Sequence, residues 1–164
     1  MKPSRWCDFD RLESVVVGQF REEAGDVHGV SHWRRVEQHG LWMASRMDVD
    51  VLVVRLFAWF HDSKRENDYT DPDHGKRGAE FARSLRGQLF DLEDSAMEKL
   101  VYACTWHTDR DFTDDLTIGT CWDADRLDLG RVGVIASPEF MNTPFGREVA
   151  KAGSFALFDF SSER

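Results

Sequence analysis

Apolar side chains recur at helical spacing along most of the chain, which predicts a series of helices. Between Asp10 and Glu23, for example, Leu12, Val16 and Phe20 fall on one helical face. The run Val51–His61 is apolar on nearly all sides, so we expect it to be the central buried helix. The predicted helices are Asp10–Glu23, one from its cap Ser31 to about Met47, Val51–His61 with its cap Asp50, Gly75–Leu89, one from its cap Asp94 or Ser95 to His107, and one from about Thr117 or Gly119 to Leu129.

The remaining segments indicate loops and short pieces. Asn67–Asp73 is polar and contains a proline, which predicts a loop. After Gly130 the helical signals weaken, and no long alternating strand pattern is present anywhere. We therefore predict an all-α fold, a single helical domain over residues 1–164. The apolar segment Phe155–Phe160 is expected to pack back on the core or against another chain, which leaves a homo-oligomer open.

Length and charge narrow the class of protein. A chain of 164 residues suits one domain with a substantial core. Its 21 basic and 30 acidic side chains give a net charge of −9, which argues against a nucleic-acid polymer as partner. A small anionic substrate remains compatible, because a few cationic side chains inside a pocket can oppose the net charge.

Localisation is expected to be cytoplasmic. Met1–Arg5 is not followed by the apolar segment of a secretory signal. The longest apolar stretch, Val51–Phe60, is about half of the roughly 20 residues that span a bilayer, so we expect no membrane partner. The three cysteines are odd in number and form no CxxC motif, which favours inert thiols in a reducing compartment.

The dipeptide His61-Asp62 ends the most apolar predicted helix. Burying an imidazole beside a carboxylate is costly unless their charge is compensated, and a divalent cation does so. Neighbouring ligands of this kind can reach one ion, or two ions that the carboxylate bridges. The pair therefore indicates a metal site at the end of this helix.

Two further motifs accompany the pair in a defined order. His32 begins His-Trp-Arg-Arg-Val upstream, and Asp125 lies downstream in Asp-Ala-Asp-Arg-Leu. Together the motifs resemble those of the HD-domain superfamily of metal-dependent phosphohydrolases, over roughly residues 28–130. The resemblance implies an HD-type helical fold in which His32, His61, Asp62 and Asp125 surround a divalent metal.

His74 and His107 extend the pattern to that of the binuclear members of the superfamily. These include HD-GYP-type phosphodiesterases and diiron oxygenases similar to myo-inositol oxygenase. The resemblance implies that Asp62 bridges two ions, with His74 and His107 on the second. The Gly-Tyr-Pro element is absent, so cyclic dinucleotide hydrolysis is not favoured. The expected cofactor is one or two divalent ions among Mn, Fe, Co, Ni, Zn and Mg.

Cationic side chains follow the His-Asp pair. Phosphoryl transfer depends on positioning and charge neutralisation, so cations beside the site matter. The superfamily often carries a lysine here, and Arg65 stands at the matching position next to Lys64. We expect either of them to contact phosphate. Arg35 is expected to serve the same pocket or to pair with Glu66, and Arg126 to be a structural ion-pair partner.

The expected function is metal-dependent hydrolysis of a small phosphorylated metabolite or nucleotide through metal-activated water, with Asp62, Lys64 and Arg65 as catalytic residues. A mixed-valent diiron oxygenase suits the same six ligands and is the alternative. A second alternative is a non-catalytic domain that a metal stabilises, or a sensor.

Other residues keep more than one interpretation. His28 is either a loop or capping residue or a contact of the site, and His39 lies on the surface or behind a ligand. Asp123 is a cap, a hydrogen-bond acceptor behind the ligands or a substitute ligand. The six tryptophans are expected to pack the core, although Trp33 or Trp106, each beside a ligand, could wall a pocket that stacks a ring.

Overall fold

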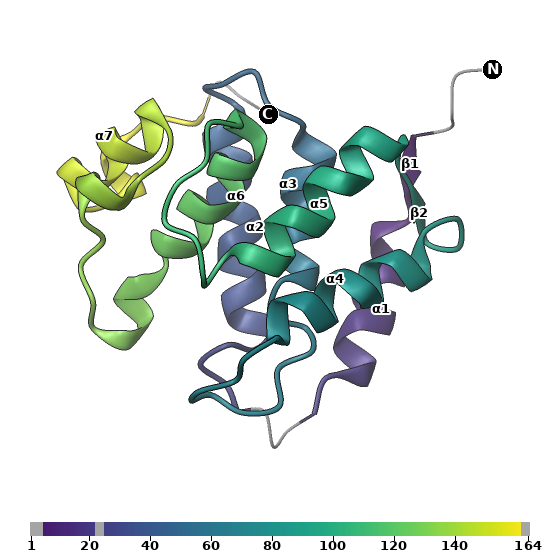
Figure 1. Cartoon of the computed structure of the whole chain (residues 1–164). Coiled ribbons are helices and arrows are strands. Elements are labelled where there is room, and N and C mark those ends of the chain that lie inside the picture. Colours follow the sequence, from purple (N-terminus) through teal and green to yellow (C-terminus); the bar gives the residue numbers. More distant parts are fainter. Residues whose placement is uncertain (1–4, 22–24, 162–164) are drawn as a thin grey trace.

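Helix α3 (Val51–Phe60) lies at the centre of the fold, as its apolar sequence predicts (Figure 1). The computed structural model describes residues 5–21 and 25–161. Helices α2, α4, α5 and α6 contact α3 and enclose it, and α1 covers a further side. The elements in chain order are β1 (Trp6–Cys7), α1 (Phe9–Gln19), α2 (Val30–Ala44), α3, α4 (His74–Leu85), β2 (Phe90–Asp91), α5 (Asp94–Trp106), α6 (Leu116–Arg126), η2 (Leu129–Val132), η3 (Pro138–Phe140), α7 (Pro144–Ala152) and η4 (Phe155–Leu157). The all-α prediction is confirmed for the described residues.

The helix starts show which local signals operate. Asp50 caps α3 as predicted, its carboxylate accepting from the backbone N–H of Val53 at 3.1 Å. Ser31 is not the cap of α2, because that helix begins one residue earlier, at Val30, behind Gly29. The cap of α5 is Glu93 rather than Asp94 or Ser95, and Asp94 instead lies in the first turn, where the helix dipole favours a carboxylate.

Other boundaries moved by a few residues. Helix α1 ends at Gln19, and the predicted end at Glu23 lies outside the described residues. Helix α4 stops at Leu85 because Arg86 turns to an extended backbone. Helix α6 begins at Leu116, behind its cap Asp115. The largest difference is α7, a regular helix where we expected only short pieces; Thr143 caps it.

A two-stranded antiparallel ladder joins the N-terminal segment to the turn between α4 and α5. Trp6 pairs with Asp91 and Cys7 with Phe90. Each strand has only two residues, which is too short to produce an alternating pattern in the sequence. The sequence therefore predicted helices alone.

The C-terminal aromatic residues pack back on the helices, which was one of the two expectations for them. Phe155 is buried against the core, with its ring 4.6 Å from that of His39. The ring of Phe160 stacks at 5.1 Å on Trp42 of α2. Residues after α6 therefore form a layer over α2 and α6 rather than a free tail.

The cysteines agree with the prediction of free thiols, but the tryptophans agree only in part with the prediction that they pack the core. Cys104 and Cys121 are buried and free, and Cys7 is half-buried and free. The prediction that every tryptophan packs the core is wrong for Trp6, which is 38% exposed on the short β1 strand. In the described part of the chain, no helix combines the length and the apolar character needed to cross a membrane.

Candidate metal centre

The ends of five helices bring six candidate ligands together. His32 lies in the first turn of α2, and His74 is the first residue of α4. His61 and His107 stand at the C-terminal ends of α3 and α5, and Asp125 belongs to α6. Asp62 follows His61 and is 2% exposed, and the four histidines are buried. Triplets of these side chains place one donor atom each within 4.8 Å of one another.

Two glycines allow the helices to approach closely enough for this arrangement. A Cβ on Gly78 would stand 2.2 Å from the carbonyl oxygen of Phe60, at the end of α3. A Cβ on Gly75 would stand 2.1 Å from the carbonyl oxygen of Cys104 and 3.1 Å from the ring of His107. The two distances to carbonyl oxygens are too short for any side chain, so the backbone of α4 depends on glycine at these positions.

In each candidate histidine ligand, Nδ1 points away from the cluster and donates a hydrogen bond to an acceptor. Nδ1 of His61 donates to the carbonyl oxygens of Phe57 and Ala58 at 3.1 Å. Nδ1 of His74 donates to the carbonyl of Asp71 at 2.6 Å, and Nδ1 of His107 to that of Cys104 at 2.7 Å. Because a carbonyl only accepts, the proton lies on Nδ1 and the neutral ring presents a lone pair at Nε2.

The first half of the cluster contains His32, His61, Asp62 and Asp125. Nε2 of His32 lies 3.1 Å from Nε2 of His61 and 3.1 Å from Oδ1 of Asp125. Oδ2 of Asp62 lies 3.6 Å and 3.5 Å from the same two nitrogens.

The second half is built on the other oxygen of Asp62. Its Oδ1 lies 3.2 Å from Nε2 of His74 and 3.4 Å from Nε2 of His107. These two nitrogens are 3.0 Å apart. A single carboxylate thus faces two pairs of imidazoles, one with each oxygen.

The donor set fits divalent metal ions. Lone pairs on nitrogens 3.0 Å apart repel each other unless a proton or cation lies between them. With bonds of about 2.1 Å to a common ion, donors at octahedral or tetrahedral angles stand about 3.0–3.4 Å apart. Most of the observed separations fall in this range, and the longest, at 3.5 and 3.6 Å, exceed it slightly. Imidazole with carboxylate suits Mn, Fe, Co, Ni and Zn better than a purely oxygen-seeking ion.

The electrostatics of the cluster favour a bound cation. Burial alone raises the pKa of Asp62, but His61, His107 and His74 outweigh it and hold the pKa well below its ordinary value. Burial likewise opposes ionisation of Asp125, yet His32 and His61 lower its pKa well below the usual range. Asp62, which is buried, and Asp125, which is partly buried, therefore remain ionised, and a positive charge beside them stabilises both.

Asp128 is the site residue that the sequence motifs did not reveal. Its Oδ2 accepts from Nδ1 of His32 at 2.7 Å, which orients that ring. Its Oδ1 accepts from Nε of Arg35 at 2.8 Å. The expected pairing of Arg35 with Glu66 is therefore wrong, because Asp128 lies closer to α2. The available signal was the spacing Asp125-x-x-Asp128, which repeats a carboxylate after about one helical turn.

The two candidate phosphate contacts lie in different places. Arg65 is 9% exposed, and its Nε donates to Oδ1 of Asp62 at 3.3 Å. Its NH1 donates to the carbonyls of Asn67 and Tyr69, both at 3.2 Å. The ammonium of Lys64 instead lies 4.2 Å from the centre of the Phe81 ring, so the structure does not bring it to the cluster.

The remaining candidates surround the cluster or lie away from it. Nδ1 of His28 lies 3.0 Å from Oδ1 of Asp68, and the rings of His28 and His32 are nearly perpendicular, with centroids 6.3 Å apart. His39 stacks on an aromatic ring behind α2. Asp123 faces the opposite side of α6 and accepts hydrogen bonds from the residues that begin α7. Arg126 donates to backbone carbonyls, so the expected ion-pair role is replaced by hydrogen bonds.

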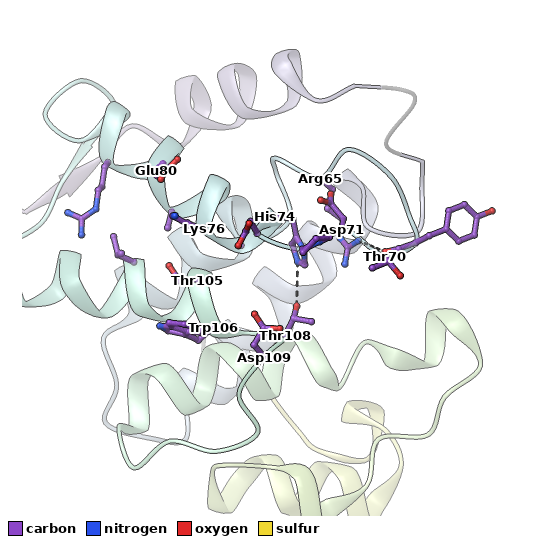
Figure 2. Close-up of a pocket in the computed structure, with 17 residues that line it drawn as sticks. Arg65, Thr70, Asp71, His74, Lys76, Glu80, Thr105, Trp106, Thr108 and Asp109 are labelled. Atoms are coloured by element: carbon purple, nitrogen blue, oxygen red, sulfur yellow. Dashed lines mark hydrogen bonds between the residues drawn. The ribbon is translucent and has the colours of Figure 1, made fainter.

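A cavity of about 780 Å³ opens beside the second half of the cluster (Figure 2). His74 and Arg65 line its inner end, and Thr108 contacts Nε2 of His74 at 3.4 Å. The outer walls come from the loop before α4, from α4 itself and from α5, including Trp106. Trp33 is fully buried and lines no part of this cavity, so of the two tryptophans beside ligands only Trp106 borders it.

Comparisons with known proteins agree with the fold. No protein-family model matches the chain, and no curated protein matches it. Among solved structures, the crystal structure of a predicted HD superfamily hydrolase from an uncultured Thermotogales bacterium is similar, with 28% sequence identity and a TM-score of 0.71. The match covers 94% of this chain and 89% of that chain. The expected HD-type helical fold and the resemblance to the superfamily are thereby confirmed.

Proposed function

We propose that this chain, which has the helical fold of the HD superfamily, is a metal-dependent phosphohydrolase that acts on a small phosphorylated metabolite. The similar crystal structure carries the name of a predicted hydrolase, which supports the general class of reaction. The ligands in this proposal are His32, His61, Asp62 and Asp125 for one ion, and Asp62, His74 and His107 for the second.

One observation carries the proposal: the two oxygens of Asp62 face two separate pairs of histidine nitrogens. This arrangement suits two ions bridged by one carboxylate, a device that stabilises both the attacking and the leaving oxygen of phosphate esters. Divalent ions held there would activate water near neutral pH and neutralise phosphoryl oxygens.

The cavity beside His74 distinguishes this proposal from a purely structural metal site. Structural sites are closed by protein ligands, whereas catalytic sites keep a side open to substrate. Here His74 lines both the cluster and a cavity large enough for a small metabolite. The described cysteines do not take part in the cluster, which also differs from common structural zinc sites.

In the proposed reaction, a water oxygen attacks phosphorus, the ester P–O bond breaks, and the alcohol leaves with a proton. Arg65 lies between Asp62 and the cavity, so its guanidinium is placed to neutralise phosphoryl oxygens. The backbone carbonyls behind His61, His74 and His107 hold the rings in the tautomer that presents Nε2. Lys64 has no part in this proposal because its ammonium lies over Phe81.

The test is phosphate release from a panel of phosphomonoesters with Mn, Fe, Co, Ni, Zn or Mg added. We expect turnover with at least one metal and a loss of about a hundredfold or more in Asp62→Asn. Asp111→Asn, an exposed aspartate outside the cluster, is the matched control and should retain activity. Absence of phosphate release across the whole panel with every metal would exclude the proposal.

A diiron oxygenase is the second candidate, because the complete set of four imidazoles and two carboxylates also suits two iron ions. Anaerobic purification followed by iron analysis and EPR spectroscopy separates the two. Two irons per chain with a mixed-valent signal, together with no phosphate release, would favour the oxygenase. Another metal at stoichiometric amount would exclude it.

A further inference from the structure

The cavity beside His74 has a reactive end and a recognition end. Its inner end meets His74 and Arg65, next to the bridging carboxylate Asp62. From there it extends between α4 and α5. A phosphoryl group at the inner end would therefore leave the rest of the substrate lying along these two helices.

Trp106 provides the flat surface at this recognition end. It directly precedes His107, is partly buried, and lines the same cavity as His74 (Figure 2). The guanidinium of Arg110 lies over its ring, 4.8 Å from the centroid, so a cation covers one face of the indole. Tyr69, the other aromatic side chain in the lining, is 87% exposed and has no such support.

Three charged side chains line the same cavity as the indole without pairing with each other. Lys76, Glu80 and Asp109 line the cavity. Within residues 5–21 and 25–161, no side-chain hydrogen bond or ion pair occupies any of these three. They are therefore available to donors and acceptors on the edge of a bound ring.

From these observations we infer that the cavity selects phosphomonoesters whose alcohol carries a planar ring, and that this ring stacks on Trp106. The inference rests on the proposed function for the position of the phosphoryl group. It adds the chemical class of the leaving group and names Trp106 as the residue that determines specificity. An aromatic stack of this kind favours a flat ring over a saturated ring of similar size by about two- to tenfold in affinity.

Two uncleaved ligands of matched shape test the inference. Benzylphosphonate and cyclohexylmethylphosphonate carry the same anion and differ in whether the ring is flat. We expect the metal-loaded protein to bind the benzyl compound about two- to tenfold more tightly in isothermal titration calorimetry. Trp106→Leu should reduce this ratio to about one, and Trp106→Phe should retain part of it.

The ratio of the two affinities is an internal control, because any disturbance of the metal ligands next to Trp106 weakens both ligands alike. Trp6→Leu, in β1 and outside the lining of this cavity, should keep the wild-type ratio. A ratio near one in the wild type, no binding of either phosphonate, or an unchanged ratio in Trp106→Leu would overturn the inference. Because these measurements need no turnover, a ring preference without phosphate release would contradict the proposed function alone.

Discussion

The two nitrogens of each imidazole have different partners in the cluster. Nδ1 of each ring donates to an acceptor behind it, and Nε2 faces the shared centre. This division follows from where the histidines stand: His61 and His107 end their helices and turn back to carbonyls of the preceding turn. The chemistry of the site is therefore set by local backbone geometry as much as by residue type.

The motifs predicted which residues meet, but not what lies behind them. His32, His61, Asp62, His74, His107 and Asp125 were all identified from their types and order, and they do come together in space. Asp128 was missed because a carboxylate that supports a ligand has no motif of its own. Lys64 and Arg65 were both offered as phosphate contacts, but their side chains point to different sides of the turn, and the ammonium of Lys64 lies over Phe81.

Asp128 should control metal affinity without being a ligand. In Asp128→Ala, Nδ1 of His32 loses its acceptor, and we expect the affinity for the first ion to fall by about 10–100-fold. Competition with a chromogenic chelator measures this change. Asp123→Asn is the matched control: this buried aspartate holds the start of α7, so its loss should lower the melting temperature and leave metal affinity near the wild-type value. Equal metal affinity in both variants would contradict the role given to Asp128.

The stability of the protein should depend on pH in opposite ways with and without metal. Burial alone lowers the pKa of His32, but Asp125 and Asp128 raise it above the ordinary value. In metal-free protein this contribution is fully present below the unfolded-state pKa of about 6.5 and is lost as pH rises through the folded-state pKa. Metal binding requires neutral imidazoles, so its stabilisation grows with rising pH.

We therefore expect the gap in melting temperature between metal-loaded and chelator-treated protein to be larger at about pH 8 than at about pH 6. Thermal denaturation followed by circular dichroism at each pH measures it. A gap that is constant or that narrows toward pH 8 would contradict this expectation.

At the scale of elements, periodicity predicted the helices from α1 to α6, while their boundaries depended on details it does not contain. A helix cap consists of one hydrogen bond, such as the one that Asp50 accepts. Because several polar residues near a helix start can accept this bond, the sequence does not decide which of them is the cap. The helix α7 was not predicted because it has nine residues and follows a segment rich in turn signals. The cap of α7, Thr143, is held in place by a hydrogen bond from its hydroxyl to Asp123, and this contact between distant residues leaves no local pattern in the sequence.

Glycine in α4 should be essential to the site although it carries no functional group. Gly75→Ala forces α4 away from Cys104 and His107, and we expect a loss of about 1–3 kcal/mol in unfolding free energy and weaker binding of the second ion. Gly18→Ala in α1 is the matched control, because no atom of the described residues lies within 4 Å of the added methyl group. That change should be neutral or stabilising by up to about 1 kcal/mol. Urea denaturation and metal titration of both variants provide the comparison, and equal behaviour would refute the close-approach argument.

At the scale of the whole molecule, α7 and residues 153–160 form a structural layer set apart from the metal ligands. Phe155 is 7% exposed and contacts the rings of His39 and Trp42. The sequence predicted that this apolar segment would be covered, but left open what would cover it. The segment is covered by the outer face of α2, which is more than 100 residues away in the sequence, so no local pattern predicts the contact.

This layer should affect stability but not metal content. Phe155→Ala removes a buried ring, and we expect a loss of about 3–5 kcal/mol in unfolding free energy with unchanged metal stoichiometry. Phe112→Ala is the control, since that ring is 59% exposed and its loss should change stability by no more than about 0.5 kcal/mol. Denaturant titration with metal analysis of the purified variants tests both statements. Loss of metal in Phe155→Ala that remains folded would contradict the separation.

The carbonyl anchors behind the histidines have a consequence for how the site tolerates sequence variation. His61, His74 and His107 are held by main-chain oxygens, which every amino acid supplies. Substitutions at the anchoring positions therefore preserve these three rings as long as the helices keep their course. His32 differs, because its anchor is the side chain of Asp128 and a single base change can remove it. Substitutions of the anchoring side chains would therefore reach the metals first through α2, whereas the α4–α5 half of the centre is sensitive to its glycines and not to the side chains at its anchoring positions.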